Sequence, residues 1–238
     1  MYELEGVKRV QLKLRSELAE AAKDFFYLLN RGYSRRSSLD LVSSRYRLSK
    51  LERMVLYRGV FSADVSRSRA LKALGPGEIY RQVLIVDGFN VASTVQSSLL
   101  RDTVVLGTDG VVRDLAAGVR KIRVTPLLVS SFTIVLEYLA RLSPSYVTVI
   151  LDSQVSKSGE LAATLREIIG GLGLCGDVFL TPRADKQASI LKGVVVASSD
   201  SVILDRVSAF FDLGGWIARI ICPESLLDLT KVIGELHA

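Results

Sequence analysis

The sequence predicts an α/β protein in which a small, basic, all-helical domain precedes a domain built on a parallel β-sheet. From residue 83 onward, apolar runs of strand length alternate with helical patterns, which is typical of a parallel sheet with helices on both faces, in three layers. The first part of the chain shows only helical patterns, and Gly75-Pro76-Gly77 separates it from the rest. We therefore expect two domains, residues 1–77 and 78–238.

Composition and charge limit the class of protein and of partner. The 238 residues are 49% hydrophobic and 24% charged, a balance typical of globular domains. The net charge of +6 is unevenly spread, because residues 1–80 hold 16 Lys/Arg against 9 Asp/Glu and the remainder holds 15 against 16. The first predicted domain, residues 1–77, is called the head below. A basic head next to a nearly neutral second domain indicates a polyanionic partner that the head binds.

No pattern indicates secretion or membrane insertion. The two cysteines lack a metal-binding or redox spacing, and the N-terminus lacks the order of a signal peptide. The apolar window 124–142 contains Glu137 and Arg141, which favours a buried helix over a membrane span. We expect a cytoplasmic protein without membrane contact. His237 is the only histidine and is the penultimate residue of the sequence. We therefore do not expect chemistry that needs a histidine base or a histidine zinc ligand.

The basic head reads as a series of short helices. Apolar positions recur at helical spacing over residues 7–29, and a second helix is expected near Ser37 with Leu39, Leu41 and Val42 facing inward. Ser49 can cap a third helix, which carries Leu51, Met54, Val55 and Tyr57, and Glu52 lies three residues later, as in a capping box. Ser62 can cap a fourth helix, over residues 63–74.

Arginine and tyrosine alternate along this head between residues 31 and 58. Arginine guanidinium groups bind phosphates, and tyrosine rings can stack on bases. The residues predicted to bind nucleic acid are Arg31, Tyr33, Arg35, Arg36, Arg45, Arg47, Arg53 and Arg58, with Lys157 as a further phosphate contact. The alternative is a solvated basic face whose tyrosines lie partly in the core.

In the remaining chain, predicted strands alternate with predicted helices. A hairpin is expected around Asp109-Gly110, and Thr125-Pro126 begins a long helix. The expected strands are residues 83–86, 146–151, 178–180, 193–197 and 216–222; the expected helices include 91–100, 126–142, 160–169, one carrying Asp205 and a closing one at 224–236.

Four aspartates directly follow predicted strand ends: Asp87, Asp152, Asp185 and Asp200. Ligands of parallel sheets bind outside these carboxyl ends, so the four carboxylates are expected to meet. Because like charges raise one another's pKa, a divalent cation is needed for compensation, and Mg²⁺ or Mn²⁺ suits carboxylate oxygens. The alternative is that these acids merely cap helices. Asn90, one of two asparagines, would orient Asp87 or the substrate.

At these residues the chain resembles the PIN-like ribonuclease superfamily, especially its NYN branch. The matching segments are LIVDGFN (84–90), VTVILDS (147–153), RADKQAS (183–189) and VVVASSD (194–200). The resemblance implies a PIN-like, Rossmannoid fold, metal-dependent RNA cleavage, and a site of Asp87, Asn90, Asp152, Asp185 and Asp200. Asp114 and Asp205 are candidates for an outer shell. The whole chain also resembles an uncharacterised archaeal family that joins a basic helical head to such a domain.

The sequence therefore predicts a Mg²⁺- or Mn²⁺-dependent endoribonuclease whose basic head holds RNA. The rival is a non-catalytic RNA-binding or scaffold protein with a degenerate PIN-like fold. A nuclease acting on DNA is a third option, which a requirement for the 2′-hydroxyl would exclude. The oligomeric state is left open, and a homodimer is compatible with the sequence.

Overall fold

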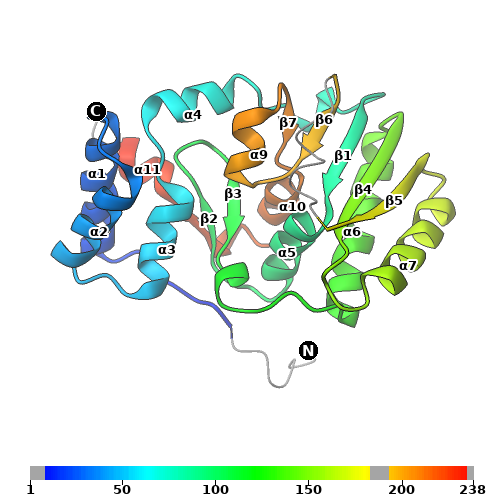
Figure 1. The fold of residues 1–238 in the computed structure, drawn as a ribbon, viewed down its shortest axis with the longest axis horizontal. Coiled ribbons are helices and arrows are strands. Elements are labelled where there is room, and N and C mark those ends of the chain that lie inside the picture. Colours follow the sequence, from blue (N-terminus) through cyan, green and yellow to red (C-terminus); the bar gives the residue numbers. More distant parts are fainter. Residues whose placement is uncertain (1–8, 183–192, 235–238) are drawn as a thin grey trace.

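The computed structural model describes residues 9–182 and 193–234. Within these residues, five parallel strands form one sheet in the order β5-β4-β1-β6-β7 (Figure 1). Its strands are β1 (Val83–Asp87), β4 (Tyr146–Asp152), β5 (Gly176–Thr181), β6 (Val195–Ala197) and β7 (Phe210–Phe211). Strand β1 lies at the centre, hydrogen-bonded to β4 and to β6. The α/β prediction is confirmed, with a Rossmann-like layout.

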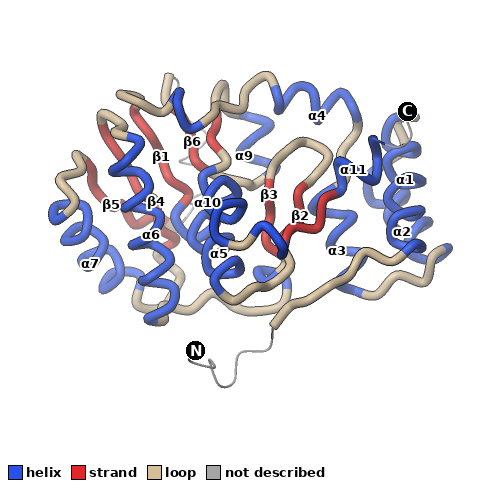
Figure 2. Tube along the Cα trace, turned by 180° about the vertical axis from the view of Figure 1, so that it is seen from behind, coloured by secondary structure: helices blue, strands red, loops and turns tan. Residues whose placement is uncertain are grey.

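Helices cover one face of this sheet, as Figure 2 shows from behind. They are α5 (Gly88–Leu99), α6 (Pro126–Leu142), α7 (Ser158–Gly171) and α10 (Leu213–Ile221). Because side chains alternate along a strand, Leu84 and Val86 of β1 pack under these helices, whereas Ile85 faces the other way. That other face packs against α9 (Ser201–Arg206) and Val111.

A small second sheet links the main sheet to the head. It contains β2 (Val104–Leu106), β3 (Val112–Asp114) and β8 (Leu226–Asp228), in the order β3-β2-β8 among the described residues. Strands β2 and β3 are antiparallel, which confirms the predicted hairpin. Strand β8 then adds parallel to β2, far from it in the sequence.

The head consists of α1 (Ser16–Asn30), α2 (Arg35–Arg45), α3 (Lys50–Gly59) and α4 (Ala63–Ala70). The predicted capping box is confirmed: the Glu52 backbone N–H donates to Ser49 Oγ over 3.3 Å, and the Ser49 N–H donates to Glu52 Oε2 over 2.8 Å. Ser62 caps α4 in the expected way. Three short 3₁₀ turns complete the described chain, at Pro76–Glu78, Ala116–Gly118 and Pro223–Ser225.

One hydrophobic cluster crosses from the head into the rest of the molecule. Phe25 of α1 and Leu56 of α3 are buried with Val105 of β2 and Leu227 of β8. Helix α11 (Leu229–Gly234) brings the end of the described chain against α1 (Figure 1). The head therefore shares its core with the hairpin and the C-terminal elements, so its position beside the second sheet is held by packing.

Three predicted elements are wrong in type or extent. Residues 216–222, expected as a strand, lie in helix α10 and the residue after it, because a short apolar run fits both periods; β7 takes the fifth place in the sheet. The first helix begins at Ser16 rather than at residue 7, since the Val10 backbone N–H donates to the Asp102 carboxylate instead, over 2.7 Å. The closing helix starts at Leu229, after β8.

One side chain expected to face the head's core, Leu41, is instead exposed, and so is Tyr57 on the third helix. Leu41 is 61% exposed and Tyr57 is 56% exposed. Both lie on helices whose inward positions are filled by other residues, Leu39 and Val42 on α2 and Val55 and Leu56 on α3. An exposed tyrosine beside arginines is available for a ligand.

The apolar window 124–142 is a core helix. Its residues Leu128, Phe132, Val135, Leu136 and Leu139 pack in the main hydrophobic cluster beneath the sheet. No helix in the described part of the chain combines the length and the apolarity needed to cross a membrane.

The capping box carries a testable pH dependence. The hydrogen bond from Arg15 lowers the pKa of Glu52 to about 2, so its stabilising effect is complete above its unfolded pKa and is lost as the pH falls toward 2. We expect Glu52→Gln to lower the free energy of unfolding at pH 7 by about 1–2 kcal/mol. Urea unfolding of both proteins should show this difference shrinking between pH 4.5 and pH 2. The matched control is Glu20→Gln on the exposed face of α1, and an equal loss there would contradict the assignment.

Candidate active site

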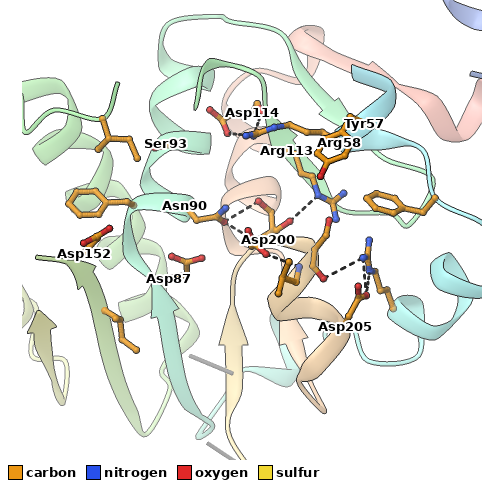
Figure 3. Close-up of a pocket in the computed structure, with 18 of the residues that line it drawn as sticks. Tyr57, Arg58, Asp87, Asn90, Ser93, Arg113, Asp114, Asp152, Asp200 and Asp205 are labelled. Carbon is orange, nitrogen blue, oxygen red and sulfur yellow. Dashed lines mark hydrogen bonds and ion pairs between the residues drawn. The ribbon is translucent and has the colours of Figure 1, made fainter. Parts of the chain in front are cut away.

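A pocket of about 570 Å³ lies where the helical head meets the carboxyl edge of the five-stranded sheet. Figure 3 shows Asp87 and Asp152 on one side, Arg58 and Arg113 on the other, and Asp200 between them. Parallel α/β sheets bind ligands at this edge. The predicted group of strand-end aspartates, Asp87, Asp152, Asp185 and Asp200, is called the rim below. The pocket joins part of this acidic rim to part of the predicted basic head.

Asp87 ends the central strand and is 7% exposed. Gly88 follows it and begins α5, in close contact with β4: a Cβ built on Gly88 would lie 2.6 Å from Leu151 Cδ2 and 2.9 Å from the Ile150 carbonyl oxygen. Only glycine fits this approach without displacing β4. The Asp-Gly pair thus lets the chain turn directly from strand to helix and leaves the Asp87 carboxylate at the pocket.

Asn90 connects this turn to the end of β6. Its Oδ1 accepts hydrogen bonds from the Ser199 backbone N–H at 2.8 Å and from the Ser199 hydroxyl at 3.0 Å. Ser198 donates its hydroxyl to Asp87 Oδ2 over 2.8 Å, and its Oγ accepts from the Asp200 N–H at 3.0 Å. Asn90 therefore acts through the loop of Ser198 and Ser199 (the serine loop), which it holds beside Asp87.

Asp152 and Asp200 each begin a local turn at the rim. Asp152 Oδ1 accepts from the Gln154 N–H over 2.8 Å, and Asp200 Oδ1 accepts from the Val202 N–H over 2.7 Å at the start of α9. Both line the pocket with Asp87. The structure thus brings three of the four predicted rim aspartates to one pocket. The fourth, Asp185, lies outside the described residues.

The rim has the kind of donor atoms that a divalent cation prefers, but its described residues do not bring enough of them together. Carboxylate oxygens are the ligands that Mg²⁺ and Mn²⁺ favour. Among residues 9–182 and 193–234, however, no group of three or more His, Cys, Asp or Glu side chains could hold a metal ion. The described part of the rim does not form a complete metal site on its own.

The two acids predicted for an outer shell face arginines. Arg58 donates from Nη1 to the Asp114 carbonyl over 2.8 Å and lies 3.5 Å from its Oδ1. Asp205 Oδ1 accepts from Arg69 over 2.8 Å. Both acids line the pocket on the side of the head and are engaged there with cations.

Only two of the predicted nucleic-acid-binding residues line this pocket, Arg35 and Arg58. Arg53 pairs with Asp40, and Arg45 lies 3.7 Å from an Asp24 carboxylate oxygen. Lys157, at the start of α7, is exposed and outside the pocket lining. The others that the pocket does not include are Arg31, Tyr33, Arg36 and Arg47.

A buried ion network fixes the wall between head and sheet. The Asp109 carboxylate is fully buried and accepts from Arg69 and Arg113, each at 2.7 Å. Burial raises the pKa of Asp109, but hydrogen bonds and charge attraction from Arg113 and Arg69 outweigh this and lower it below its ordinary value. Arg113 Nε also donates to the Ser199 carbonyl over 2.9 Å, so the network reaches the rim loop.

Residues 76–216 match the family model described as Domain of unknown function (DUF5616). The chain belongs to the DUF5616 family. Residues 17–72 match a second model, Protein of unknown function (DUF434). An uncharacterized protein from Methanocaldococcus jannaschii is 31% identical over 187 residues, which cover 79% of this chain and 88% of that protein. No solved structure matches the chain. The pocket is lined from both matched ranges, with the aspartates in the DUF5616 domain and Arg35 in the other.

Several residues that line the pocket or lie directly behind its wall escaped prediction. Asp109 was expected only as a turn residue of a hairpin in the DUF5616 domain, and Arg69 and Arg113 gave no signal. Arg69 is 2% exposed although it lies on a short, mostly polar helix. Its burial depends on the distant Asp109 and Asp205, which no local pattern indicates. The Ser198-Ser199 pair offered a weak signal, because hydroxyls beside a strand-end aspartate can orient it.

We expect Asp109→Asn to be among the most damaging single substitutions in the DUF5616 domain. It would leave two buried guanidinium groups without their shared carboxylate, at a cost of roughly 3–5 kcal/mol in the free energy of unfolding. The control is Asp205→Asn, whose side chain is 55% exposed and whose loss should cost less than about 1 kcal/mol. Denaturant unfolding monitored by circular dichroism separates the two, and similar losses would contradict a central role for Asp109.

Proposed function

We propose that this pocket is the active site of a PIN-like nuclease of the NYN type, which cleaves phosphodiester bonds of RNA. The five-stranded parallel sheet and the positions of Asp87, Asp152 and Asp200 at its carboxyl edge support the proposal. Asp87 and Asn90 stand at the end of the central strand, which agrees with the motif that carries the resemblance.

The observation that carries the proposal is the opposition of charges across one pocket. Carboxylates alone repel a phosphate, so an acidic rim needs cations nearby before a nucleic acid can enter. Arg35 and Arg58 supply these cations from the head, and Figure 3 shows Arg58 on the wall opposite Asp87 and Asp152. A phosphodiester can therefore be held by the arginines while a neighbouring bond faces the aspartates.

Mg²⁺ or Mn²⁺ is the cofactor that we propose for this site. A bound ion would supply an activated water and stabilise the leaving oxygen. The chain's own residues hold the rim in place: Asn90 fixes the serine loop, and Ser198 orients Asp87. Because the described acids do not complete a metal site, the proposal requires a further ligand, and Asp185 is the candidate from the sequence.

The lack of a complete metal site among the described acids favours a second candidate function. Without a complete group of acids, the pocket would still bind RNA through its arginines, and the protein would be a non-catalytic RNA-binding module with a degenerate PIN-like fold. The two candidates differ in one measurable respect, which is cleavage.

We expect the purified protein to cleave unstructured RNA in the presence of Mn²⁺ and to stop when the metal is chelated. Asp87→Asn and Asp200→Asn should each lower the cleavage rate by about 100-fold or more, since each removes a carboxylate that would hold the catalytic cation. The assay is gel analysis of a labelled RNA over time, with the folded state of each variant checked by circular dichroism.

The matched control is Asp64→Asn, an exposed aspartate in the first turn of α4 that lies outside the pocket. It should cleave at the rate of the unaltered protein. Equal cleavage by all three variants would identify a contaminating nuclease and remove the proposal. RNA binding without cleavage would favour the second candidate, and equal cleavage of the DNA analogue would replace RNA as the substrate.

A further inference from the structure

The head side of the pocket contains an unusual gathering of arginines. The guanidinium carbons of Arg35, Arg69 and Arg113 lie 4.5, 4.2 and 4.8 Å from the centroid of the Phe61 ring. Cations gather on an aromatic ring in this way because its faces carry negative potential. Three guanidinium groups around one ring nevertheless repel one another and need counter-charges.

Two of the three arginines have such counter-charges. Arg69 pairs with Asp109 and Asp205, and Arg113 pairs with Asp109. Arg35 forms no ion pair within the described part of the chain. Besides its contacts with aromatic rings, it donates hydrogen bonds to the Val60 carbonyl, over 2.8 Å, and to the Tyr57 carbonyl. The arginine cluster therefore presents to the pocket a guanidinium group that has no carboxylate partner among residues 9–182 and 193–234.

The surroundings of Arg35 make this missing partner energetically significant. Burial is the main cause that lowers the pKa of Arg35 to about 10; the charges of Arg69 and Arg113 act in the same direction, and Tyr57 and Asp109 oppose it. At neutral pH the group is still charged. An anion that enters the pocket would restore the balance, and it would meet N–H groups that the two carbonyls do not use, because a guanidinium has five.

Helix α3 adds two further groups to the same pocket. Arg58 uses Nη1 for Asp114, at 2.8 Å from the carbonyl oxygen, and its side chain is 31% exposed. Tyr57, next to it in the sequence, presents a 56% exposed ring, and the Arg35 guanidinium lies 5.2 Å from that ring's centroid. Guanidinium groups suit a phosphate, and an exposed ring suits a base.

We propose that this pocket binds single-stranded RNA, with one phosphate between Arg35 and Arg58 and a base stacked on Tyr57, so that the adjoining phosphate faces the aspartate rim. The inference rests on the proposed function and adds the strandedness of the substrate and the residues that hold it. A single strand can lower one backbone and an unstacked base into a pocket of about 570 Å³. A duplex keeps its bases paired and its backbones on a wide surface, so it cannot place Tyr57 against a base.

The test measures binding without cleavage, by fluorescence anisotropy of a labelled single-stranded RNA of about ten nucleotides in EDTA. Arg35→Ala, Arg58→Ala and Tyr57→Ala should each raise the dissociation constant about tenfold. For the arginine variants, the slope of log affinity against log salt should fall by about 0.7 per removed phosphate contact. A duplex of the same sequence should bind at least about tenfold more weakly than the single strand.

The control is Arg67→Ala, an exposed arginine on α4 that lies outside the pocket, which should change the dissociation constant less than about twofold. Arg36→Ala tests the rival location, the outer surface of α2. A loss for Arg36→Ala equal to that for Arg35→Ala would overturn the proposal, and so would tighter binding of the duplex.

Arg35 also supports its neighbours, so its replacement by alanine could unfold the head. Arg35→Lys, which keeps the charge, and the two α3 variants keep the test decisive, because Tyr57 and Arg58 are partly exposed. Selective loss of single-strand binding in the α3 variants would uphold the pocket even if the protein cleaves nothing. Unchanged binding in both α3 variants would overturn it even if Asp87→Asn abolishes cleavage, so failure of this inference and failure of the proposed function are distinguishable.

Discussion

The arrangement of this protein depends on one buried carboxylate between two guanidinium groups. Asp109, at the turn of the hairpin, accepts hydrogen bonds from Arg69 of α4 and Arg113 of β3. Arg69 also donates to Asp205 of α9, and Arg113 also donates to the carbonyl of Ser199 at the rim. Three parts of the chain that are far apart in the sequence, namely the hairpin, α4 and the stretch 199–205, thus meet in one network. Burial of these charges costs desolvation free energy, and loss of one partner would leave a buried charge without compensation. The network therefore favours the one arrangement of head and sheet in which all its partners meet.

The pocket follows from that arrangement. The network and the shared hydrophobic core place α2 and α3 opposite the carboxyl edge of the sheet. Arg35 and Arg58 consequently face aspartates rather than open solvent, although both belong to the helical head. The proposed site needs both halves, because the aspartates come from the sheet and the cations Arg35 and Arg58 come from the head. The proposed chemistry is therefore a property of the interface between the two matched ranges.

Local patterns predicted much of the fold. The capping box of Ser49 and Glu52, the hairpin at Asp109-Gly110 and the long helix after Thr125 depend on neighbours within a few residues, and each is confirmed. Prediction was wrong where two periods fit the same run, as at residues 216–222, of which 216–221 lie in α10. It was also wrong where a distant partner captured the backbone, as Asp102 does at Val10.

The sequence by itself determined that Asp87, Asp152 and Asp200 follow strand ends, because a strand's length and the alternation of its side chains are local properties. It also determined that the head is basic. Tertiary structure alone decided which of eight predicted head residues meet the rim: Arg35 and Arg58 line the pocket, whereas Arg36, adjacent in the sequence, does not. Successive residues of a helix point in different directions, and only the packing of α2 and α3 against the sheet selects the direction that matters.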